Sequence, residues 1–249
     1  RIILKQKPDI LQFEDAISVL RYMNLIDALK IPVCLELQDV EATLLSDLGF
    51  TDENVVVTKA ITAMACDYAD AVVCMTNKDR SELIDDIGID TGKLFLVPNP
   101  VDTNFFAYHG VNIKASNLLF IGNMFYWPNA QAASILVNNI FPKVLKHYPD
   151  AHLTLVGLIP PRLKKQFTSS ATTCTGAVSD MSPYLQNATL GLCPVQVGSG
   201  MKVKILNYCA SGIPVVTTSL GYSGYECIDG IIVEDNIMRH HEIIIRMLK

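Results

Sequence analysis

The sequence predicts an α/β protein made of two domains, each built on a parallel sheet. Short apolar segments alternate with amphipathic segments of helix length along the 249 residues. Consecutive parallel strands need a crossover connection, so this alternation indicates βαβ units. One stretch rich in proline and asparagine, VPNPVDTNFF, interrupts the alternation. Half of the residues are hydrophobic and 18% are charged, a composition typical of a well-buried globular chain.

The first part of the chain contains four apolar segments of strand length. They predict strands at residues 10–13, 32–37, 71–75 and 94–97. The segments between them have apolar residues at helical spacing and predict helices at residues 16–29, 54–68 and 78–87. Glu14 and Asp15 follow the first strand. A helix-capping role is favoured for them over that of a carboxylate working on an acceptor.

Residues 97–106 mark the boundary between the domains. They include two prolines, and because proline fixes φ and lacks an N–H group, no strand or helix is expected to cross them. We predict a first domain at residues 1–105 and a second at residues 106–249. The linker lies near residues 98–112, and a cleft is expected between the domains.

The second part repeats the same alternation and predicts the larger domain. Strands are expected at residues 118–122, 152–156, 190–194, 214–217 and 231–233. Helices are expected at residues 129–147, 201–210 and 238–248.

Charge and cysteine usage exclude several classes of protein. The net charge of −5, without a long run of like charges, argues against a broad nucleic-acid-binding face. No apolar run of about 18 residues predicts a membrane span, and no signal peptide is visible. Seven cysteines without a Cys-x-x-Cys pair, and five histidines without metal-ligand spacing, indicate reduced thiols and no metal site. A first residue of Arg1 suggests a fragment, a processed product or a renumbered chain.

The segment VGSGMKVKILNYCASGIPVV combines glycines with lysines at a predicted helix start. It fits neither the P-loop nor the dinucleotide fingerprint, because Lys202 is not followed by Ser or Thr and Val203 occupies the third small position. A helix start still offers free backbone N–H groups to an anion. An anion site without either nucleotide motif is therefore expected here.

Several segments together resemble the GT-B glycosyltransferases of family 4, the group 1 sugar transferases. The resemblance rests on LELQDVEATL, ADAVVCMTNKDRSELID, VPNPVDTNFF, LLFIGNMFYWPNAQAA, PDAHLTLVG and the glycine-lysine segment, in the family's order. It implies two Rossmann-like domains, with the first incomplete because members carry several βα units before the equivalent of Arg1. Either another chain or a missing segment is then expected to cover the first sheet's edge.

The resemblance also implies a function. A retaining, metal-independent enzyme would transfer a sugar from a UDP- or GDP-sugar, held mainly by the second domain, to a glycan, lipid or protein acceptor. No cofactor is implied beyond this donor substrate, and no nucleic acid. We expect a cytoplasmic protein, either free or peripheral to the inner face of the membrane.

The family's pattern assigns roles to particular residues. Lys204 maps to the lysine at the donor diphosphate, and with Asn123 and Gln38 it forms the predicted catalytic set. Donor binding is assigned to nine residues: Gly122, Val178, Asp180, Gly198, Ser199, Gly200, Met201, Lys202 and Asn207. Asn207 would meet the donor ribose. The two lysines could instead lie on a solvated helix face, which is favoured for Lys202 and not for Lys204.

Other positions leave two interpretations open. Asp180 either lies against the donor base with its neighbours or caps the next helix. Trp127 either flanks a sugar or packs between the domains.

The chain departs from the family at charged positions, and this leaves a second hypothesis. Ser199 and Asn207 replace two glutamates, Asn123 replaces an arginine and Gln38 replaces a histidine. An amide can still form hydrogen bonds but carries no charge. The alternative to an active transferase is a GT-B relative that binds nucleotide or a partner protein without turnover.

Overall fold

The computed structural model describes residues 5–113, 115–225 and 228–249. The chain divides into two compact units, and each is described by itself. Unit 1 contains residues 1–99 together with Val197–Met201, and unit 2 contains Pro100–Gln196 and Lys202–Lys249. The sequence-based boundary at residues 105/106 falls just beyond the first of these divisions and stays a prediction.

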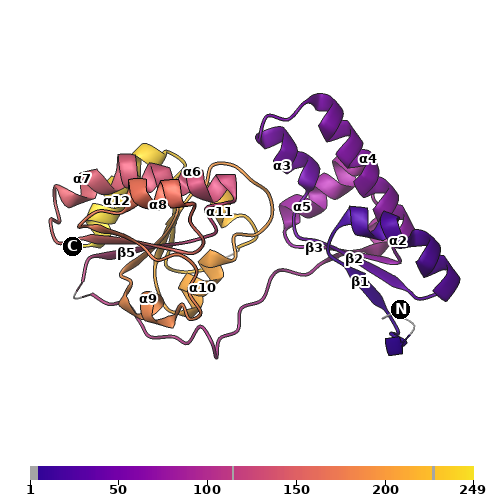
Figure 1. The fold of residues 1–249 in the computed structure, drawn as a ribbon, viewed down its shortest axis with the longest axis horizontal. Helices are drawn as coiled ribbons and strands as arrows, with labels where there is room; N and C mark the ends of the chain where they lie inside the picture. The colour runs from indigo at the N-terminus through magenta and orange to yellow at the C-terminus, as the bar shows by residue number, and fades with distance from the viewer. Residues whose placement is uncertain (1–4, 114, 226–227) are drawn as a thin grey trace. The chain divides into compact units, whose positions relative to one another are not determined.

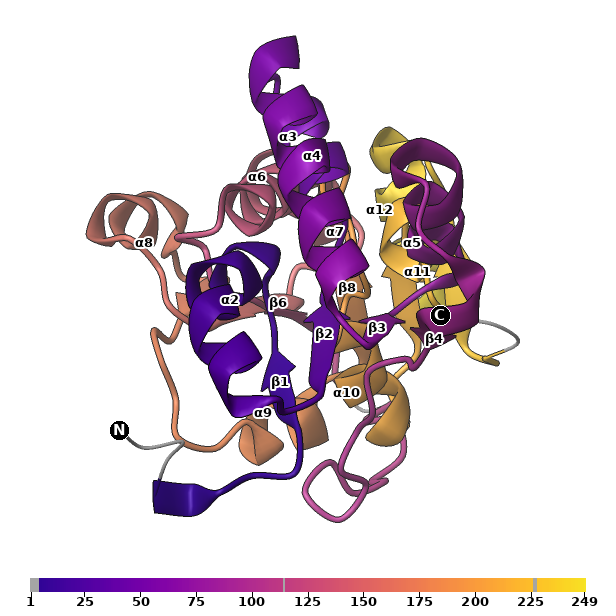
Figure 2. The ribbon, with the colours of Figure 1, turned by 90° about the vertical axis from the view of Figure 1, so that its right-hand side faces the viewer.

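Unit 1 is a parallel four-stranded sheet whose strands follow one another in chain order (Figure 2). The strands are β1 (Leu11–Phe13), β2 (Val33–Leu37), β3 (Ala71–Cys74) and β4 (Leu94–Leu96). The helices are α2 (Ala16–Leu29), α3 (Glu41–Asp47), α4 (Asp52–Tyr68) and α5 (Asn77–Glu82), and α5 continues into a π-helical turn, η1 (Leu83–Ile87). A 3-10 turn, η2 (Thr91–Lys93), precedes β4.

The helices of unit 1 lie on one face of its sheet (Figure 1). Right-handed crossovers between strands in sequential order place every connection on the same side. Alternate residues of β2 and β3 are accordingly buried under these helices. Three of the helices, α2, α4 and α5, begin at side-chain caps, the last of them at Thr76. Asp15 accepts a hydrogen bond from the Ser18 N–H at 2.7 Å, and Thr51 accepts one from the Asn54 N–H. The capping role expected of Asp15 is therefore confirmed.

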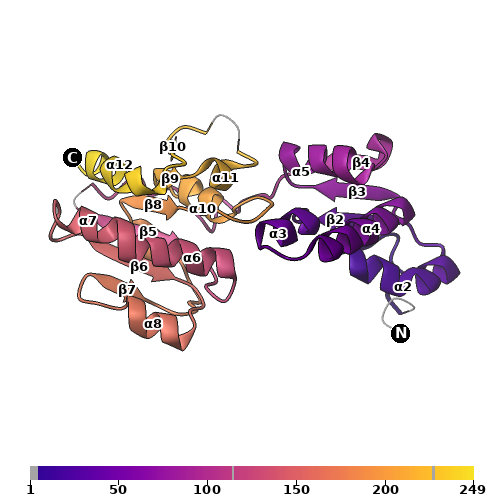
Figure 3. The same cartoon turned by 90° about the horizontal axis from the view of Figure 1, so that it is seen from above.

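Unit 2 is a parallel six-stranded sheet with the order β10-β9-β8-β5-β6-β7, which Figure 3 shows from above. The strands are β5 (Asn117–Ile121), β6 (His152–Val156), β7 (Thr172–Cys174), β8 (Leu190–Cys193), β9 (Val215–Thr217) and β10 (Ile231–Val233). From β5 the chain adds two strands on one side, then returns to place β8, β9 and β10 on the other side.

Helices cover both faces of this second sheet (Figure 1). On one face lie α6 (Trp127–Ile135), which runs through the π-helical turn η3 (Leu136–Ile140) into α7 (Phe141–Leu145), together with α8 (Pro161–Phe167) and α12 (His240–Met247). On the other face lie α9 (Ser182–Asn187) and α10 (Lys204–Ala210). The short helix α11 (Ser219–Tyr222) follows β9, and a 3-10 turn, η4 (Ile237–Arg239), leads into α12.

The predicted α/β class with parallel sheets is confirmed, and every predicted strand exists within one or two residues. One strand and four α-helices were not predicted from the sequence: β7, α3, α8, α9 and α11. Each has only three to seven residues, too short for a periodic pattern. The helix expected at residues 201–210 was placed wrongly at its start. It begins at Lys204, so residues 198–201 precede it as a loop.

The cysteines outside residues 226–227 are free, and four of them are buried: Cys66, Cys74, Cys174 and Cys193. Burial raises the pKa of the Cys66 thiol to about 12. A buried thiol with a raised pKa is a packing group rather than a nucleophile. Cys227 lies outside the described residues.

Candidate functional site

The candidate site lies where the strand order of unit 2 reverses. The connections from β5 run toward β6 and β7, whereas the later strands start again at β8 on the opposite side of β5. In open α/β sheets such a switch point leaves a crevice at the carboxyl ends of the two strands, because the adjoining connections diverge to opposite faces. The residues that follow β5 include Gly122 and Asn123, and the segment that follows β8 leads to Lys204.

The two central strands separate toward this crevice. Strand β5 pairs with β8 only at Leu118↔Leu190 and Leu119↔Gly191. The buried hydroxyl of Tyr208 replaces the missing strand contacts, because it accepts from the Ile121 N–H at 2.8 Å and donates to the Leu119 carbonyl at 3.3 Å. Burial raises the pKa of Tyr208, so the hydroxyl stays neutral.

Gly191 makes room for this tyrosine. A Cβ atom at Gly191 would lie 2.5 Å from the Tyr208 ring, so no other residue fits there without displacing the ring. The glycine in β8 and the tyrosine in α10 thus together hold the sheet open at the switch point.

Lys204 reaches through the opening. It begins α10 on one face of the sheet, yet its Nζ donates to Asn129 Oδ1, on α6 of the opposite face, at 2.6 Å (Figure 1). Its Nζ also lies 4.4 Å from the centre of the Phe120 ring, which is a cation–π contact. Both partners are neutral, and no described carboxylate forms an ion pair with Lys204.

This environment changes the acidity of the lysine. Burial lowers the pKa of Lys204, and the charge of the Cys193 sulfur acts in the opposite direction. An ammonium group removed from water favours a negatively charged partner, which the described side chains do not supply. The site therefore has the electrostatic character of an anion-binding site.

The turn after β5 is tied to the same network. Asn129 Nδ2 donates to the Asn123 carbonyl at 3.1 Å, and Asn123 Oδ1 accepts from the Phe125 N–H at 3.0 Å. A Cβ atom at Gly122 would lie 3.0 Å from the Asn129 side chain, closer than side chains normally approach. The structure thus brings Lys204, Asn123 and Gly122 together through Asn129, whose contact with Lys204 the sequence did not indicate.

A pocket of about 290 Å³ adjoins this turn at the carboxyl ends of β5 and β6. It is lined by Ile121, Gly122, Asn123, Val156, Gly157, Leu158, Ala177, Val178 and Met181. The structure therefore places Val178 beside Gly122, another predicted donor residue, and beside Asn123 of the predicted catalytic set. Asp180 lies at the exposed edge of the same loop, where its Oδ1 accepts from the Ser182 N–H at 2.8 Å at the beginning of α9. That hydrogen bond lowers the pKa of the Asp180 carboxyl.

Two predicted residues of unit 2 lie apart from this network. Asn207 is buried in α10 with 7% of its surface exposed, so its ribose role stays a prediction. Lys202 precedes the helix, and its carbonyl accepts from the Tyr225 hydroxyl at 2.9 Å.

The remaining predicted residues belong to unit 1. The side chain of Gln38 follows β2 and donates to Glu36 Oε1 at 2.5 Å. In the loop 198–201, Gly198 has φ 121° and Gly200 has φ 66°, values that a side chain disfavours. The catalytic role of Gln38 and the donor-binding role of residues 198–201 therefore stay predictions.

Comparison with known proteins shows that the chain is similar to glycosyl transferases. Residues 115–249 match the family described as "Glycosyl transferases group 1". A 44.6 kDa protein from the cps region of Klebsiella pneumoniae, itself uncharacterized, is 29% identical over 128 residues, which cover 48% of this chain and 33% of that protein.

Several solved structures share the fold of the chain. Anabaena HepE in complex with UDP and glucose has a TM-score of 0.75 and 14% identity, covering 100% of this chain and 70% of HepE. TarM has a TM-score of 0.74 and 13% identity, covering 96% of this chain and 47% of TarM. Sucrose-phosphate synthase from Thermosynechococcus elongatus has a TM-score of 0.74 and 13% identity, covering 99% of this chain and 68% of the synthase. The chain thus spans about a third of the Klebsiella protein and about half of TarM.

Proposed function

Because the chain belongs to the group 1 glycosyl transferases, we propose that it transfers a sugar from a nucleoside-diphosphate sugar to a glycan, lipid or protein acceptor. We propose that the reaction retains the configuration of the transferred sugar. Within the described residues no helix is long and apolar enough to cross a bilayer. The proposed location is the cytoplasm, either free or at the inner face of the membrane.

The observation that carries this proposal is the ammonium group of Lys204 at the switch point. It is partly buried and held by the neutral Asn129 Oδ1, without an ion-pair partner among the described residues. When the bond from sugar to phosphate breaks, negative charge accumulates on the diphosphate that leaves. A fixed cation at that place stabilises the charge as it develops, which lowers the barrier to transfer.

The neighbouring residues supply position rather than charge. Asn129 orients Lys204 and also holds the Asn123 carbonyl, so one side chain aligns the lysine with the turn after β5. We propose that Asn123 takes part through its amide, in a place where relatives use a charged residue. The adjoining pocket, lined by Gly122 and Val178, is the proposed place of the nucleobase.

UDP is the proposed nucleotide because the similar structure of HepE was obtained with UDP and with UDP-glucose. We further propose that backbone N–H groups of residues 198–201 face the diphosphate. The positive φ angles of Gly198 and Gly200 allow successive N–H groups to converge on an anion. Lys202 and Asn207 complete the proposed donor set, and Gln38 the proposed catalytic set.

The test is UDP binding by calorimetry, followed by donor turnover. Lys204→Ala should weaken UDP binding by about 1.5–3 kcal/mol, the range for a hydrogen bond to a charged group. The matched control is Lys146→Ala, since Lys146 is an exposed lysine of unit 2 at the end of α7 and should not affect UDP.

Equal UDP affinity of wild type and Lys204→Ala would remove Lys204 from the donor site. UDP binding that depends on Lys204, without hydrolysis or transfer from UDP-sugars and GDP-sugars, would favour the non-catalytic relative instead. Turnover that Lys204→Ala reduces would support the transferase.

A further inference from the structure

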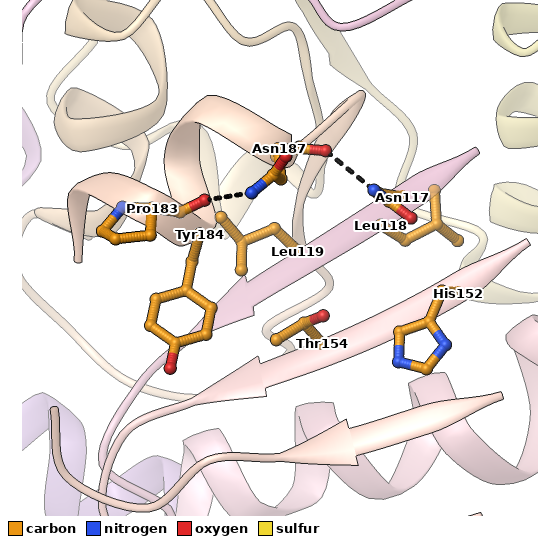
Figure 4. A pocket seen from close by; sticks show the side chains of 9 residues that line it. Asn117, Leu118, Leu119, His152, Thr154, Pro183, Tyr184 and Asn187 are labelled. Carbon is orange, nitrogen blue, oxygen red and sulfur yellow. Dashed lines mark hydrogen bonds between the residues drawn. The ribbon is translucent and has the colours of Figure 1, made fainter. Parts of the chain in front are cut away.

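A second feature of unit 2 lies at the opposite ends of its central strands. Parallel sheets normally bury both faces, and their strands are then apolar throughout. Strand β6 departs from this rule. Its sequence HLTLV buries Leu153 and Leu155 on one face, whereas His152 and Thr154 stay half-exposed on the other. Helix α9 packs against β5 on that second face, and the neighbouring part of β6, with His152 and Thr154, lies beside it (Figure 4).

The open part of the sheet and α9 enclose a pocket of about 240 Å³ (Figure 4). Its lining consists of Asn117, Leu118, Leu119, His152, Thr154, Pro183, Tyr184, Asn187 and Ala188. None of these residues is an acid, a lysine or an arginine. This pocket contains none of the residues of the candidate site, because Asn117 and His152 begin their strands, whereas Gly122 follows the carboxyl end of β5.

The polar side chains of this pocket are held in place by their neighbours. Asn117 Nδ2 donates to the Asn187 carbonyl at 3.0 Å, which directs the amide and leaves its Oδ1 available. The Asn187 side chain in turn donates to the Pro183 carbonyl at 2.8 Å. His152 Nε2 is fixed 2.8 Å from Thr173 Oγ1. A ligand would therefore meet polar groups that are already oriented, which reduces the entropy lost on binding.

Two hydroxyl groups of the pocket have no hydrogen bond within the described part of the chain. They belong to Thr154 on β6 and Tyr184 on α9. Figure 4 shows the Tyr184 ring extending from α9 beside Thr154. The pocket thus combines one aromatic wall with neutral groups that can donate and accept hydrogen bonds.

We propose that this pocket binds one neutral sugar ring of a carbohydrate chain. A sugar ring has an apolar face of C–H groups, which packs on an aromatic ring, and hydroxyls around its edge that pair with amide, imidazole and hydroxyl groups. A phosphate or carboxylate would find no cation in the lining. A purely apolar ligand would leave Asn117 and Thr154 desolvated without partners. The proposal does not depend on the donor site.

In the experiment, the full chain is titrated separately with maltotriose, cellotriose and triacetylchitotriose, and NMR monitors the binding of each trisaccharide. At least one trisaccharide should bind wild type. Tyr184→Ala should weaken that binding about tenfold, equivalent to about 1.4 kcal/mol. Thr154→Val, which keeps the side-chain shape, should weaken it severalfold through the lost hydroxyl. Tyr184→Phe keeps the aromatic wall and should retain most of the affinity.

Two controls separate binding from folding. Tyr22→Ala removes a half-exposed tyrosine of unit 1 and should leave trisaccharide affinity unchanged. If Tyr184→Ala does not fold, Thr154→Val decides the question, because Tyr184→Phe is expected to bind nearly as wild type does.

Three results would overturn the proposal. The first is that none of the trisaccharides binds wild type. The second is that Thr154→Val and, where it folds, Tyr184→Ala bind as wild type does. The third is that inorganic phosphate displaces the trisaccharide, because the pocket would then be an anion site. UDP affinity is measured on every variant, so that failure of the donor site is recognised separately.

Discussion

The two sheets of this protein have the same parallel pairing but differ in strand order. Unit 1 adds β1 to β4 in sequence, so neighbouring connections lie side by side on one face. Unit 2 reverses direction at β5, and connections diverge to both faces. Only the reversal separates two adjacent strands and opens a crevice, into which Lys204 extends. Strand order, rather than strand composition, therefore determines which sheet can hold a ligand between its strands.

The largest effect is expected from removing the tyrosine that holds β5 and β8 apart. Tyr208→Ala deletes a fully buried aromatic ring and should lower the free energy of unfolding of unit 2 by about 3–5 kcal/mol. Hydrogen exchange of β5 and β8 should increase, while exchange of β2 and β3 in unit 1 should not. Equal loss of protection in both units would show that the two sheets are not independent.

The next effect concerns the charge in the crevice. Because burial lowers the pKa of Lys204, this lysine should lose its proton at a lower pH than an exposed lysine. UDP affinity should then fall as pH rises through that lowered pKa. The loss of binding free energy should reach at most the value expected for Lys204→Ala, about 1.5–3 kcal/mol. Calorimetry at a series of alkaline pH values checks this. Lys204→Ala should show no such dependence, and a parallel decline in that variant would contradict the assignment.

A smaller effect is expected at Gly191, which gives the Tyr208 ring its space. Gly191→Ala forces a Cβ atom into that ring and should lower the free energy of unfolding by about 1–3 kcal/mol, as overpacking does in cores. Thermal and urea unfolding measure the change. Gly92→Ala in unit 1 is the matched control, because its Cβ would meet only the Asp90 carboxylate at 3.3 Å. Equal stability of Gly191→Ala and wild type would mean that the ring moves without cost.

The smallest effect involves His240, which begins α12. Burial lowers the pKa of His240 below 6.5, although its hydrogen bond to the Glu234 carbonyl and the nearby Glu234 and Asp235 act in the opposite direction. The unfolded chain therefore binds more protons than the folded chain just below pH 6.5, so unit 2 should lose stability as pH falls through this window. His240→Gln should reduce this acid sensitivity. Urea unfolding at several pH values provides the measurement, and an unchanged slope in the variant would exclude His240 as its source.

The sequence by itself determined the class of fold, because the alternation of strand and helix patterns is local. It also placed Lys204, Asn123 and Gly122 in one site through the resemblance, and the structure does bring them together. The short elements α9 and β7 could not be predicted, since three to six residues do not establish a period.

Only the tertiary structure decided how the lysine is held. Asn129 lies 75 residues before Lys204, and Gly191 and Tyr208 lie on different elements, so no local pattern connects them. The pocket beside Tyr184 was likewise invisible, because its residues come from two strands and a helix whose neighbourhood depends on the strand order. Local periodicity determines which segments become strands and helices. Contacts between distant segments arise only when the chain reverses at β5, and they give Lys204 its neutral partners and its lowered pKa.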